Sequence, residues 1–596
     1  MDLEHKMKRK NVAQGENHQE EEDNWVYDSS VDFNGGVPLR ASTGVWKASL
    51  FIIALEFSER LSFFGIASNL ITYLTKVIHQ DLKTAAQNVN LWTGVTTVMP
   101  LIGGFLADSY TGRFTMVLIS SLIYLTGLSL LTISHYVPTL KPPRKIHEVV
   151  MFLGLYCISV GTGGHKPCLE SFGADQFDDD HSEERKKKMS FFNWWNCGLC
   201  LGLLLGATVI VYVEDRVSWG VAELMLTINM AIAVVIFYIG RPFYRYRVAQ
   251  GSPLTPMFQV LVAALRKRNL PCPSSVTLLY EVPKSKSMNG RLLCHTNRFG
   301  FLDKAAIVEE DEHTPNFQRK ENPWKLATVT KVEEVKLILI MIPIWLTALP
   351  FGVCFAQTST FFTKQATTLN LNVIPNFKIP PASIVSLAAV GMITSVTIYD
   401  KILVPYLRKT TGNERGISIL QRIGIGMVFS IASMSVAALV ERKRLELANN
   451  NELGSLASMS VFWLAPQSLI LGLGDGFAMV GLQEYFYDQV PDSMRSLGIA
   501  FFLSIIGVGS FLSSFLISVV DSVTEISSGK SWFGNNLNVS RLDNFYWLLA
   551  AVNVLNLCLF VTIAKGYTYK TIDRKVVVAK TCSVGNDIDS EVITTA

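Results

Sequence analysis

Long apolar runs separated by short polar connections dominate this chain of 596 residues. A helix needs about 20 mostly apolar residues to cross the hydrocarbon core of a bilayer. Runs of that length recur from Trp46 to Gly566, and we count about twelve of them. The pattern therefore predicts an all-α integral membrane protein with about twelve transmembrane helices.

The expected spans fall into two groups of six, separated by a polar stretch. This division is typical of secondary transporters, whose substrate path runs between two bundles. The expected spans are 46–77, 88–107, 115–134, 149–172, 189–213 and 221–240, then 333–363, 379–399, 416–440, 460–486, 496–520 and 545–565. The expected divisions are a disordered cytoplasmic tail at 1–45, an N-terminal six-helix bundle at 46–240, a central cytoplasmic loop at 241–332, a C-terminal six-helix bundle at 333–566 and a cytoplasmic tail at 567–596.

Basic residues of the short connections concentrate on one side of the predicted membrane. Cytoplasmic loops carry an excess of Lys and Arg, so this side is expected to be the cytoplasm. Two basic segments, 141–145 and 442–444, fall on the opposite side. The residues that set the orientation are Arg113, Arg185, Lys188, Arg241, Arg245, Arg247, Lys401, Arg408, Lys409 and Arg415.

The central loop contains an apolar stretch at 256–265 that ends in Arg266-Lys-Arg268. A short amphipathic helix with basic residues is typical of segments that lie at a membrane surface. We therefore expect a helix there.

Composition excludes several other classes of protein. Hydrophobic residues make up 49% of the chain and charged residues only 17%, with a net charge of +4 that provides no basic face for nucleic acid. The pair Cys197 and Cys200 lies in an apolar run, where cysteines act as small hydrophobic residues rather than as zinc ligands. The chain has no His-Glu-x-x-His, Gly-x-Ser-x-Gly or phosphate-binding loop. We expect no enzyme activity, no cofactor and no metal site.

Three ionisable residues, Glu56, Glu59 and Arg60, lie in the middle of the first predicted span. Their spacing puts them on one face of a helix. An ionisable residue at membrane depth costs about 2.5–3.5 kcal/mol, so it usually marks an ion or substrate path. We interpret the group as a proton-coupled switch, and a static salt bridge is the alternative.

The fourth predicted span holds Lys166 in the sequence Gly161-Thr-Gly-Gly-His-Lys166-Pro167. Glycines and a proline break allow a backbone to approach a ligand closely, which favours a functional lysine. A simple ion pair with Glu170, one turn away, is the alternative. His165 is able to titrate, although a single histidine often serves packing.

Two acidic residues, Asp475 and Glu484, lie on roughly opposite faces of the tenth predicted span. The glycines around Asp475 follow no predicted strand, so we attribute them to close helix packing and not to a nucleotide loop.

Several motifs occur in the order found in the plant nitrate and peptide transporter family, which belongs to the proton-dependent oligopeptide transporters of the major facilitator superfamily. The chain resembles that family from Trp46 to Gly566. The motifs are Glu56-Phe-Ser-Glu-Arg60, Gly103-Gly-Phe-Leu-Ala-Asp108-Ser-Tyr-Thr-Gly112-Arg113, Gly161-Thr-Gly-Gly-His-Lys166-Pro167, Phe172-Gly-Ala-Asp175-Gln-Phe177, Phe191-Phe-Asn-Trp-Trp-Asn196-Cys-Gly198, Phe301-Leu-Asp-Lys-Ala-Ala306, Asn322-Pro-Trp324 and Leu420-Gln-Arg-Ile-Gly-Ile-Gly426.

The resemblance implies a major facilitator fold and roles for particular residues. Glu56, Glu59 and Arg60 are expected to couple proton movement, Lys166 to pair with them during the cycle, and Glu484 to contact substrate.

The pocket-lining candidates depart from the family patterns. Phe63-Phe64 replaces a Tyr-Tyr pair of peptide-transporting relatives, and Ala67 stands where many non-plant peptide carriers have a second Arg. Phe355, two residues before Gln357, replaces a His of some nitrate-transporting relatives.

The expected function is proton-driven symport of a small anionic or zwitterionic solute, such as a peptide, nitrate or an organic anion. A proton-independent facilitator or exporter, and a receptor with the fold of a transporter, are the alternatives. The expected partners are the solute, protons and the lipid of a plasma or vacuolar membrane.

The orientation gives the first testable prediction. A protease-cleavable tag inserted in the central loop at 285 stays intact when protease is added to sealed, right-side-out cells, and is cut after the cells are permeabilised. Cleavage in sealed cells would reverse the assigned orientation.

Overall fold

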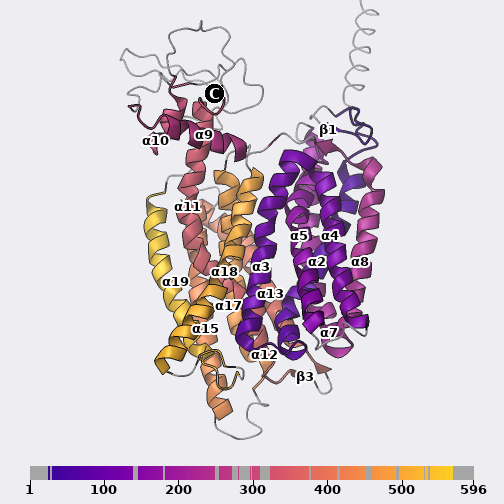
Figure 1. Ribbon diagram of the computed structural model, residues 1–596, viewed down its shortest axis with the longest axis vertical. Helices are drawn as coiled ribbons and strands as arrows, with labels where there is room; N and C mark the ends of the chain where they lie inside the picture. The colour runs from indigo at the N-terminus through magenta and orange to yellow at the C-terminus, as the bar shows by residue number, and fades with distance from the viewer. Residues whose placement is uncertain are drawn as a thin grey trace, which may run out of the picture.

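The computed structural model is a bundle of long helices (Figure 1). Eleven helical segments in the part of the chain that it describes are long and apolar enough to cross a membrane. The 32-residue helix α2 (Val45–Lys76), which carries the three ionisable residues at its centre, packs against them but is not one of the eleven. The expected all-α membrane fold is confirmed. The described residues are 24–26, 30–137, 145–178, 181–247, 251, 254–271, 279–280, 295–296, 298–308, 322–374, 377–411, 416–449, 459–490, 495–528, 531–534 and 537–567.

The N-terminal half packs α2 against α6 and α8, and α5 against α3 and α4. The Asp81 side chain starts α3 by accepting a hydrogen bond from the Thr84 backbone amide. The sequence prediction of a break at Pro167 is wrong, because α5 continues through it. The bounds are α3 Leu82–Leu106, α4 Arg113–Tyr136, α5 Lys145–Ala174, α6 Ser182–Leu205, α7 Val211–Arg216 and α8 Trp219–Ile239, with a π-helical turn, Gly206–Ile210, joining α6 to α7.

The C-terminal half packs α17 against α13 and α15, and α11 against α18 and α19. The bounds are α11 Val329–Ala356, α12 Thr363–Ala366, α13 Ser386–Ile398, α14 Val404–Thr411, α15 Ile419–Asn449, α17 Ala465–Gln489, α18 Arg495–Ser528 and α19 Leu542–Lys565. A short antiparallel pair, β3 (Asn372–Ile374) with β4 (Phe377–Lys378), lies in the connection between α12 and α13.

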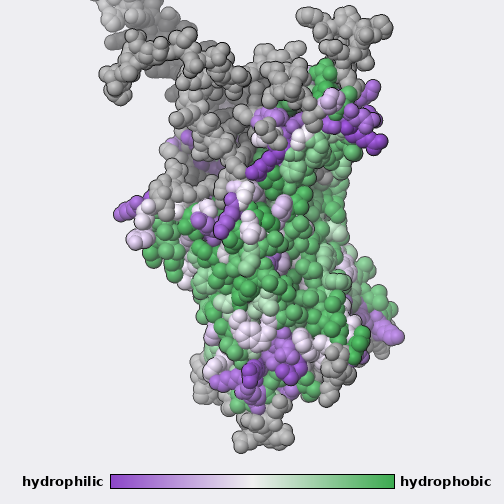
Figure 2. Space-filling view, turned by 90° about the vertical axis from the view of Figure 1, so that its left-hand side faces the viewer, coloured by the Kyte–Doolittle hydropathy of each residue, from purple (hydrophilic) through white to green (hydrophobic). Residues whose placement is uncertain are grey.

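On the face that Figure 2 shows, hydrophobic residues form a broad band across the middle of the molecule, and hydrophilic residues gather toward both ends. Such a band matches the hydrocarbon layer of a bilayer. The strand β1 and the helix α9 lie at the same end, which is the end that the sequence predicts to face the cytoplasm (Figure 1).

The segment before α2 is folded, so the expectation of a disordered tail reaching residue 45 is wrong for residues 30–44. β1 (Ser30–Val31) pairs with β2 (Tyr246–Arg247), which follows α8. Arg40 contacts Asp178 at 2.9 Å and Glu184 at 2.6 Å. The polar composition of this segment indicated disorder, but its charged residue Arg40 forms ion pairs with the bundle. The most N-terminal residues, 1–23, lie outside the described residues.

Glu184 also binds Arg245, which is fully buried. The two groups are 2.7 Å apart, and Arg245 donates a second hydrogen bond to the Thr43 carbonyl at 3.0 Å. This brace joins the N-terminal segment, α6 and β2 at the end of the first bundle where β1 lies.

The predicted helix of the central loop is present as α9 (Leu254–Arg266). Its buried residues Val260 and Ala263 pack with Val332 of α11, whereas Phe258 is exposed. Contact of α9 with a membrane surface stays a prediction. After α9, the short helix α10 (Gly300–Asp303) is anchored to α11 by the buried Lys336, which lies 2.7 Å from Asp303.

Polar contacts between the two halves gather at the end opposite to β1 and α9, and close packing continues to the middle of α3, where Gly507 of α18 lies against Thr97 and Val98. α3 packs along α18, with Gln87 donating to Ser518 at 2.7 Å and Lys83 paired with Asp521. On the other side of the interface, Lys364 donates to the Thr75 hydroxyl at 2.8 Å. We call this end of the molecule the outer end, because the predicted orientation places it outside the cell.

One of the basic segments that opposed the orientation has a structural role. Arg444 is fully buried and lies 2.7 Å from Glu441, and it also donates to the Asn538 side chain at 2.8 Å. Because its charge is balanced within the protein, Arg444 carries little information on orientation. Of the other segment, residues 141–144 lie outside the described residues.

The brace around Glu184 yields a stability prediction. Burial raises the pKa of Glu184, but hydrogen bonds from Arg245, the Asp178 backbone and Arg40 outweigh that effect and lower it overall. A lowered carboxyl pKa stabilises the fold above the unfolded pKa, and the stabilisation is lost as the pH falls through the folded value. Glu184→Gln should therefore reduce the free energy of unfolding by about 3 kcal/mol at pH 7, because it leaves Arg245 buried without its counter-charge.

The measurement is thermal unfolding in detergent at pH 7 and at a pH below about 4. The difference in unfolding temperature between wild type and variant should shrink at the lower pH. Glu446→Gln, which removes one partner of an exposed ion pair with Arg442, is the control. Equal stability of wild type and Glu184→Gln at pH 7 would contradict the assignment.

Candidate functional site

The three ionisable residues of α2 form a buried ionic group, which we call the α2 triad. Arg60 Nε lies 3.0 Å from Glu56 Oε1, and Arg60 Nη2 lies 2.6 Å from Glu59 Oε2. Their exposed fractions are 3% for Glu56, 0% for Glu59 and 5% for Arg60. Glu56 Oε2 and Glu59 Oε1 have no hydrogen-bond partner among the described residues. With two carboxylates and one guanidinium, the fully ionised triad carries one net negative charge.

Glycines of α6 allow this helix to approach the triad closely. A Cβ atom on Gly202 would lie 2.8 Å from Arg60 Cβ, and one on Gly206 would lie 2.8 Å from the Leu61 carbonyl oxygen. A larger residue at either position would push α6 away from α2. The close contact excludes water from one side of the triad and strengthens its electrostatic interactions.

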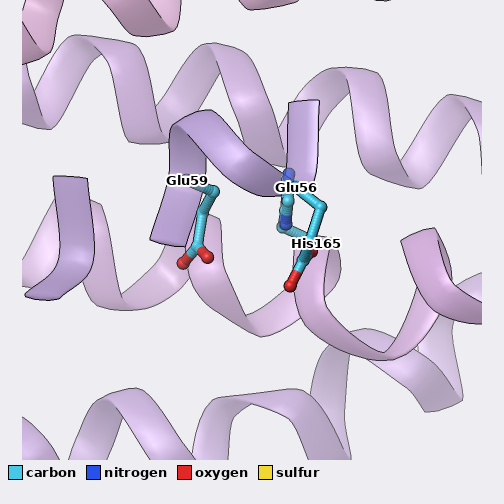
Figure 3. Close-up of side chains that lie close together, drawn as sticks. All are labelled: Glu56, Glu59 and His165. Atoms are coloured by element: carbon cyan, nitrogen blue, oxygen red, sulfur yellow. The ribbon is translucent and has the colours of Figure 1, made fainter. Parts of the chain in front are cut away.

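His165 of α5 lies beside the carboxylates of the triad. Nitrogen and oxygen atoms of His165, Glu56 and Glu59 lie within 4.8 Å of one another, and Figure 3 shows the three side chains close together. His165 is fully buried, and neither of its ring nitrogens has a hydrogen-bond partner among the described residues. The Arg60 guanidinium already occupies the cationic position between the two acids, so the arrangement favours a proton over a metal ion.

The glycines before His165 pack against neighbouring helices and do not line an open path. A Cβ atom on Gly161 would lie 2.7 Å from the Ser120 carbonyl oxygen of α4, and one on Gly163 would lie 2.8 Å from Met99 Cβ of α3. The glycine run therefore fixes the position of His165 and Lys166 by close packing.

Lys166 contacts an aromatic ring instead of a carboxylate. Its Nζ lies 4.8 Å from the ring centroid of Phe63, a cation–π distance. Within the described part of the chain Lys166 has no ion pair, so the alternative of a pair with Glu170 is wrong for this conformation. An ammonium group near the triad is thus available to an anionic ligand.

Phe63 belongs to an aromatic wall next to Lys166. It stacks on Trp92 of α3 with a centroid distance of 5.6 Å and meets Phe64 edge to face at 5.3 Å. Arg60 also lies 5.9 Å from the Phe63 ring. Two of the predicted pocket-lining residues therefore lie beside the charged group.

The other two pocket candidates belong to the C-terminal half. Gln357 follows α11, is fully buried and donates to Ser513 of α18 at 3.2 Å. Its Oε1 has no partner among the described residues. Phe355 is partly buried against the apolar core of α11, α17 and α18.

The acids of α17 have different environments. Asp475 is buried, and its Oδ1 has no hydrogen-bond partner within the described residues. The nearby Gly472 and Gly476 lie directly against Ala388 and Ser395 of α13, as expected for glycines that permit close packing. Glu484 is partly exposed and lies 3.5 Å from Arg422 of α15. It is not paired with Lys166.

Sequence reasoning missed three residues of this region. Arg422 binds Glu484 and lies 4.3 Å from the Tyr399 ring centroid. Tyr124 of α4 is fully buried near Glu59 and Arg60, and its hydroxyl has no partner among the described residues. Trp92 forms the aromatic wall. These contacts join different helices, so no local sequence signal indicates them.

Two bundles of six spans, with charged residues held at membrane depth, define a polytopic transporter fold. Comparisons with known proteins identify the family. The sequence model of the POT family matches residues 114–533. Two proteins of Arabidopsis thaliana, NRT1/PTR FAMILY 5.6 and NRT1/PTR FAMILY 5.7, are 59% and 57% identical to the chain over 93% and 96% of its length and over 96% of each relative. The crystal structure of the POT family transporter PepTSo matches with a TM-score of 0.66 and 19% identity, covering 87% of this chain and 98% of that one.

The chain belongs to the POT family of transporters, together with the plant NRT1/PTR FAMILY proteins. The predicted family membership is confirmed, and so is the expectation that the protein is a transporter and not an enzyme.

The position of Lys166 gives a prediction for this site. Lys166→Ala should reduce uptake by about tenfold or more, because a charged contact to a ligand contributes about 1.5–3 kcal/mol. Its amount in the membrane should stay unchanged, because the substitution breaks no ion pair. Uptake and surface abundance are measured together, with the exposed Lys401→Ala as the control. Full uptake by Lys166→Ala would exclude the lysine from ligand binding.

Proposed function

We propose that this protein is a proton-coupled symporter of a small anionic or zwitterionic solute, such as a peptide, nitrate or an organic anion, and that it works by alternating access. The observation that carries the proposal is the charge of the buried α2 triad. Together with Lys166, the ionised triad sums to zero. An anionic group bound to Lys166 leaves one negative charge, which a proton on Glu56 or Glu59 neutralises.

This charge balance links substrate to proton. Burial makes an uncompensated charge expensive, so the state that carries both solute and proton is favoured over a state that carries the solute alone. Glu170, one turn after Lys166, is partly exposed and lies outside this group of four charges. His165 beside the acids offers a neutral imidazole through which a proton can pass.

The surroundings of Lys166 support a solute with a negative group and an apolar part. Phe63, Phe64 and Trp92 give the site an apolar wall, and Lys166 gives it the cation. Phenylalanine at positions 63 and 64 supplies no hydroxyl groups, so the solute's polar contacts depend on Lys166 and on groups of the C-terminal half. The buried Gln357 side chain is a candidate from that half.

Alternating access is supported by the contacts between the halves. The polar contacts lie at the outer end, between α3 and α18 and between Thr75 and Lys364. Opening to the outside therefore requires these polar contacts to separate while each half keeps its own core.

Replacing a triad carboxylate tests the proposal. Glu59→Gln mimics the protonated acid, so proton-driven accumulation should be lost while exchange of solute across the membrane continues. The measurement compares accumulation under an inward proton gradient with counterflow at equal pH, in proteoliposomes that contain wild type, Glu56→Gln or Glu59→Gln.

The amount of folded protein separates coupling from a purely structural salt bridge. Loss of a structural bridge would unpair Arg60 and cost about 3–5 kcal/mol, reducing the protein recovered from the membrane. Full proton-dependent accumulation in both variants would contradict the proposed role of the triad.

A further inference from the structure

A second buried group of titratable side chains lies near the outer end of the N-terminal half, and we call it the outer cluster. Tyr73 Oη of α2 lies 2.6 Å from His147 Nε2 of α5 and 3.0 Å from His135 Nε2 of α4. His135 Nε2 lies 3.4 Å from Glu223 Oε2 of α8. Tyr73 follows Glu59 by 14 positions, or about 21 Å along the helix, so the cluster is separate from the α2 triad.

The outer cluster is enclosed but not sealed. His147 and Tyr73 are 0% and 4% exposed, whereas the side chains of His135 and Glu223 are 12% and 10% exposed. The ring of Trp219, at the start of α8, meets Tyr73 edge to face with a centroid distance of 4.8 Å. Water therefore reaches His135 and Glu223 more readily than Tyr73 and His147.

Hydrogen-bond counting restricts the protonation of the two histidines. Tyr73 has one hydroxyl hydrogen, so it can donate to only one imidazole. The other Nε2 atom must carry a hydrogen and donate to the phenol oxygen. The shorter contact favours donation from Tyr73 to His147. His135 then carries the hydrogen on Nε2, which faces both Tyr73 and Glu223, and its Nδ1 is free to take a further proton.

Glu223 lacks a permanent counter-charge. Its Oε2 has no well-formed hydrogen bond among the described residues, and no Lys or Arg in that part of the chain forms an ion pair with it. Other charged groups near the cluster do not compensate it: Glu214 of α7 accepts from Asn69 at 3.0 Å, Glu148 of α5 accepts from Gln80 at 2.6 Å, and the exposed Arg216 donates to the Lys378 carbonyl of the other half. A protonated His135 is the available partner for the Glu223 carboxylate.

We infer that the outer cluster is a second proton-binding site, in which His135 takes a proton from external water at Nδ1 and the resulting imidazolium pairs with Glu223. The proton comes from solvent and returns to it, and no covalent bond between heavy atoms changes. Imidazole is the side chain suited to this task, because it titrates between about pH 5 and 8.

The outer cluster lies next to a contact between the two halves, so its protonation affects transport. Thr75, two residues after Tyr73, accepts the hydrogen bond from Lys364, and α12 packs against α2 at this level. A change of charge around Tyr73 therefore acts on the outer contact between the halves. The outer cluster senses external acid there, whereas the α2 triad acts at the centre of the bundle.

Trp219 reports directly on the cluster. The fluorescence of purified protein is measured from pH 8 to pH 4.5 without substrate, and the signal of Trp219→Phe is subtracted to isolate this tryptophan. We expect one titration with a midpoint between about pH 5 and 8, because an imidazolium nearby quenches indole emission. In His135→Asn this titration should disappear.

A second variant protects the test against a folding defect. Glu223→Gln removes the carboxylate, so the midpoint should fall by about one pH unit or more. His79→Asn is the matched control, because His79 is an exposed histidine near the same end of α2 with a φ of 64°, which asparagine tolerates. It should leave the titration unchanged.

The same measurement separates the outer cluster from the proposed coupling site. Glu59→Gln should keep the Trp219 titration with an unchanged midpoint, whether or not that variant accumulates substrate. The inference is overturned if the wild type shows no Trp219 titration, if well-folded His135→Asn retains it in full, or if Glu223→Gln leaves the midpoint where it was.

Discussion

The arrangement of the N-terminal half depends on one constraint, the cost of keeping Glu56, Glu59 and Arg60 at membrane depth. A guanidinium between two carboxylates meets most of that cost through charge balance, but it leaves one negative charge over. The surrounding helices fit this requirement. Gly202 brings α6 against α2, and the glycine run of α5 brings Lys166 and His165 to the same region. A small change in bound charge therefore has a large effect on the energy of this site.

Charge balance also organises the end of each half where β1 and α9 lie. Glu184 holds Arg245 and Arg40 in the first half, whereas Lys336 lies between Asp303 and Glu333 in the second, at 2.7 and 2.8 Å. The contacts between the halves combine the ion pair of Lys83 with Asp521 and hydrogen bonds such as Gln87 to Ser518. A typical hydrogen bond contributes only about 0.5–1.5 kcal/mol net, so a limited number of such bonds can separate and re-form. Two rigid bundles joined by exchangeable contacts suit a rocking motion.

The sequence predicts the membrane helices and the α2 triad well, because both depend on local spacing. It does not predict partners that lie on other helices. Phe63 as the contact of Lys166, and Arg422 as the contact of Glu484, depend on how helices pack. The folded segment at 30–44 was missed because the polar and charged residues that hold it to the bundle also give it the composition of a disordered tail. The outer cluster was missed because its members are single residues on four helices.

The proposed coupling requires that a proton on the α2 triad crosses the membrane together with the solute. The most direct measurement uses proteoliposomes that contain the purified protein, an internal pH dye and equal pH on both sides. A solute gradient alone should then drive protons inward, so the interior acidifies as solute enters, and it should not acidify in protein-free liposomes. Solute entry with no change of internal pH would contradict the account.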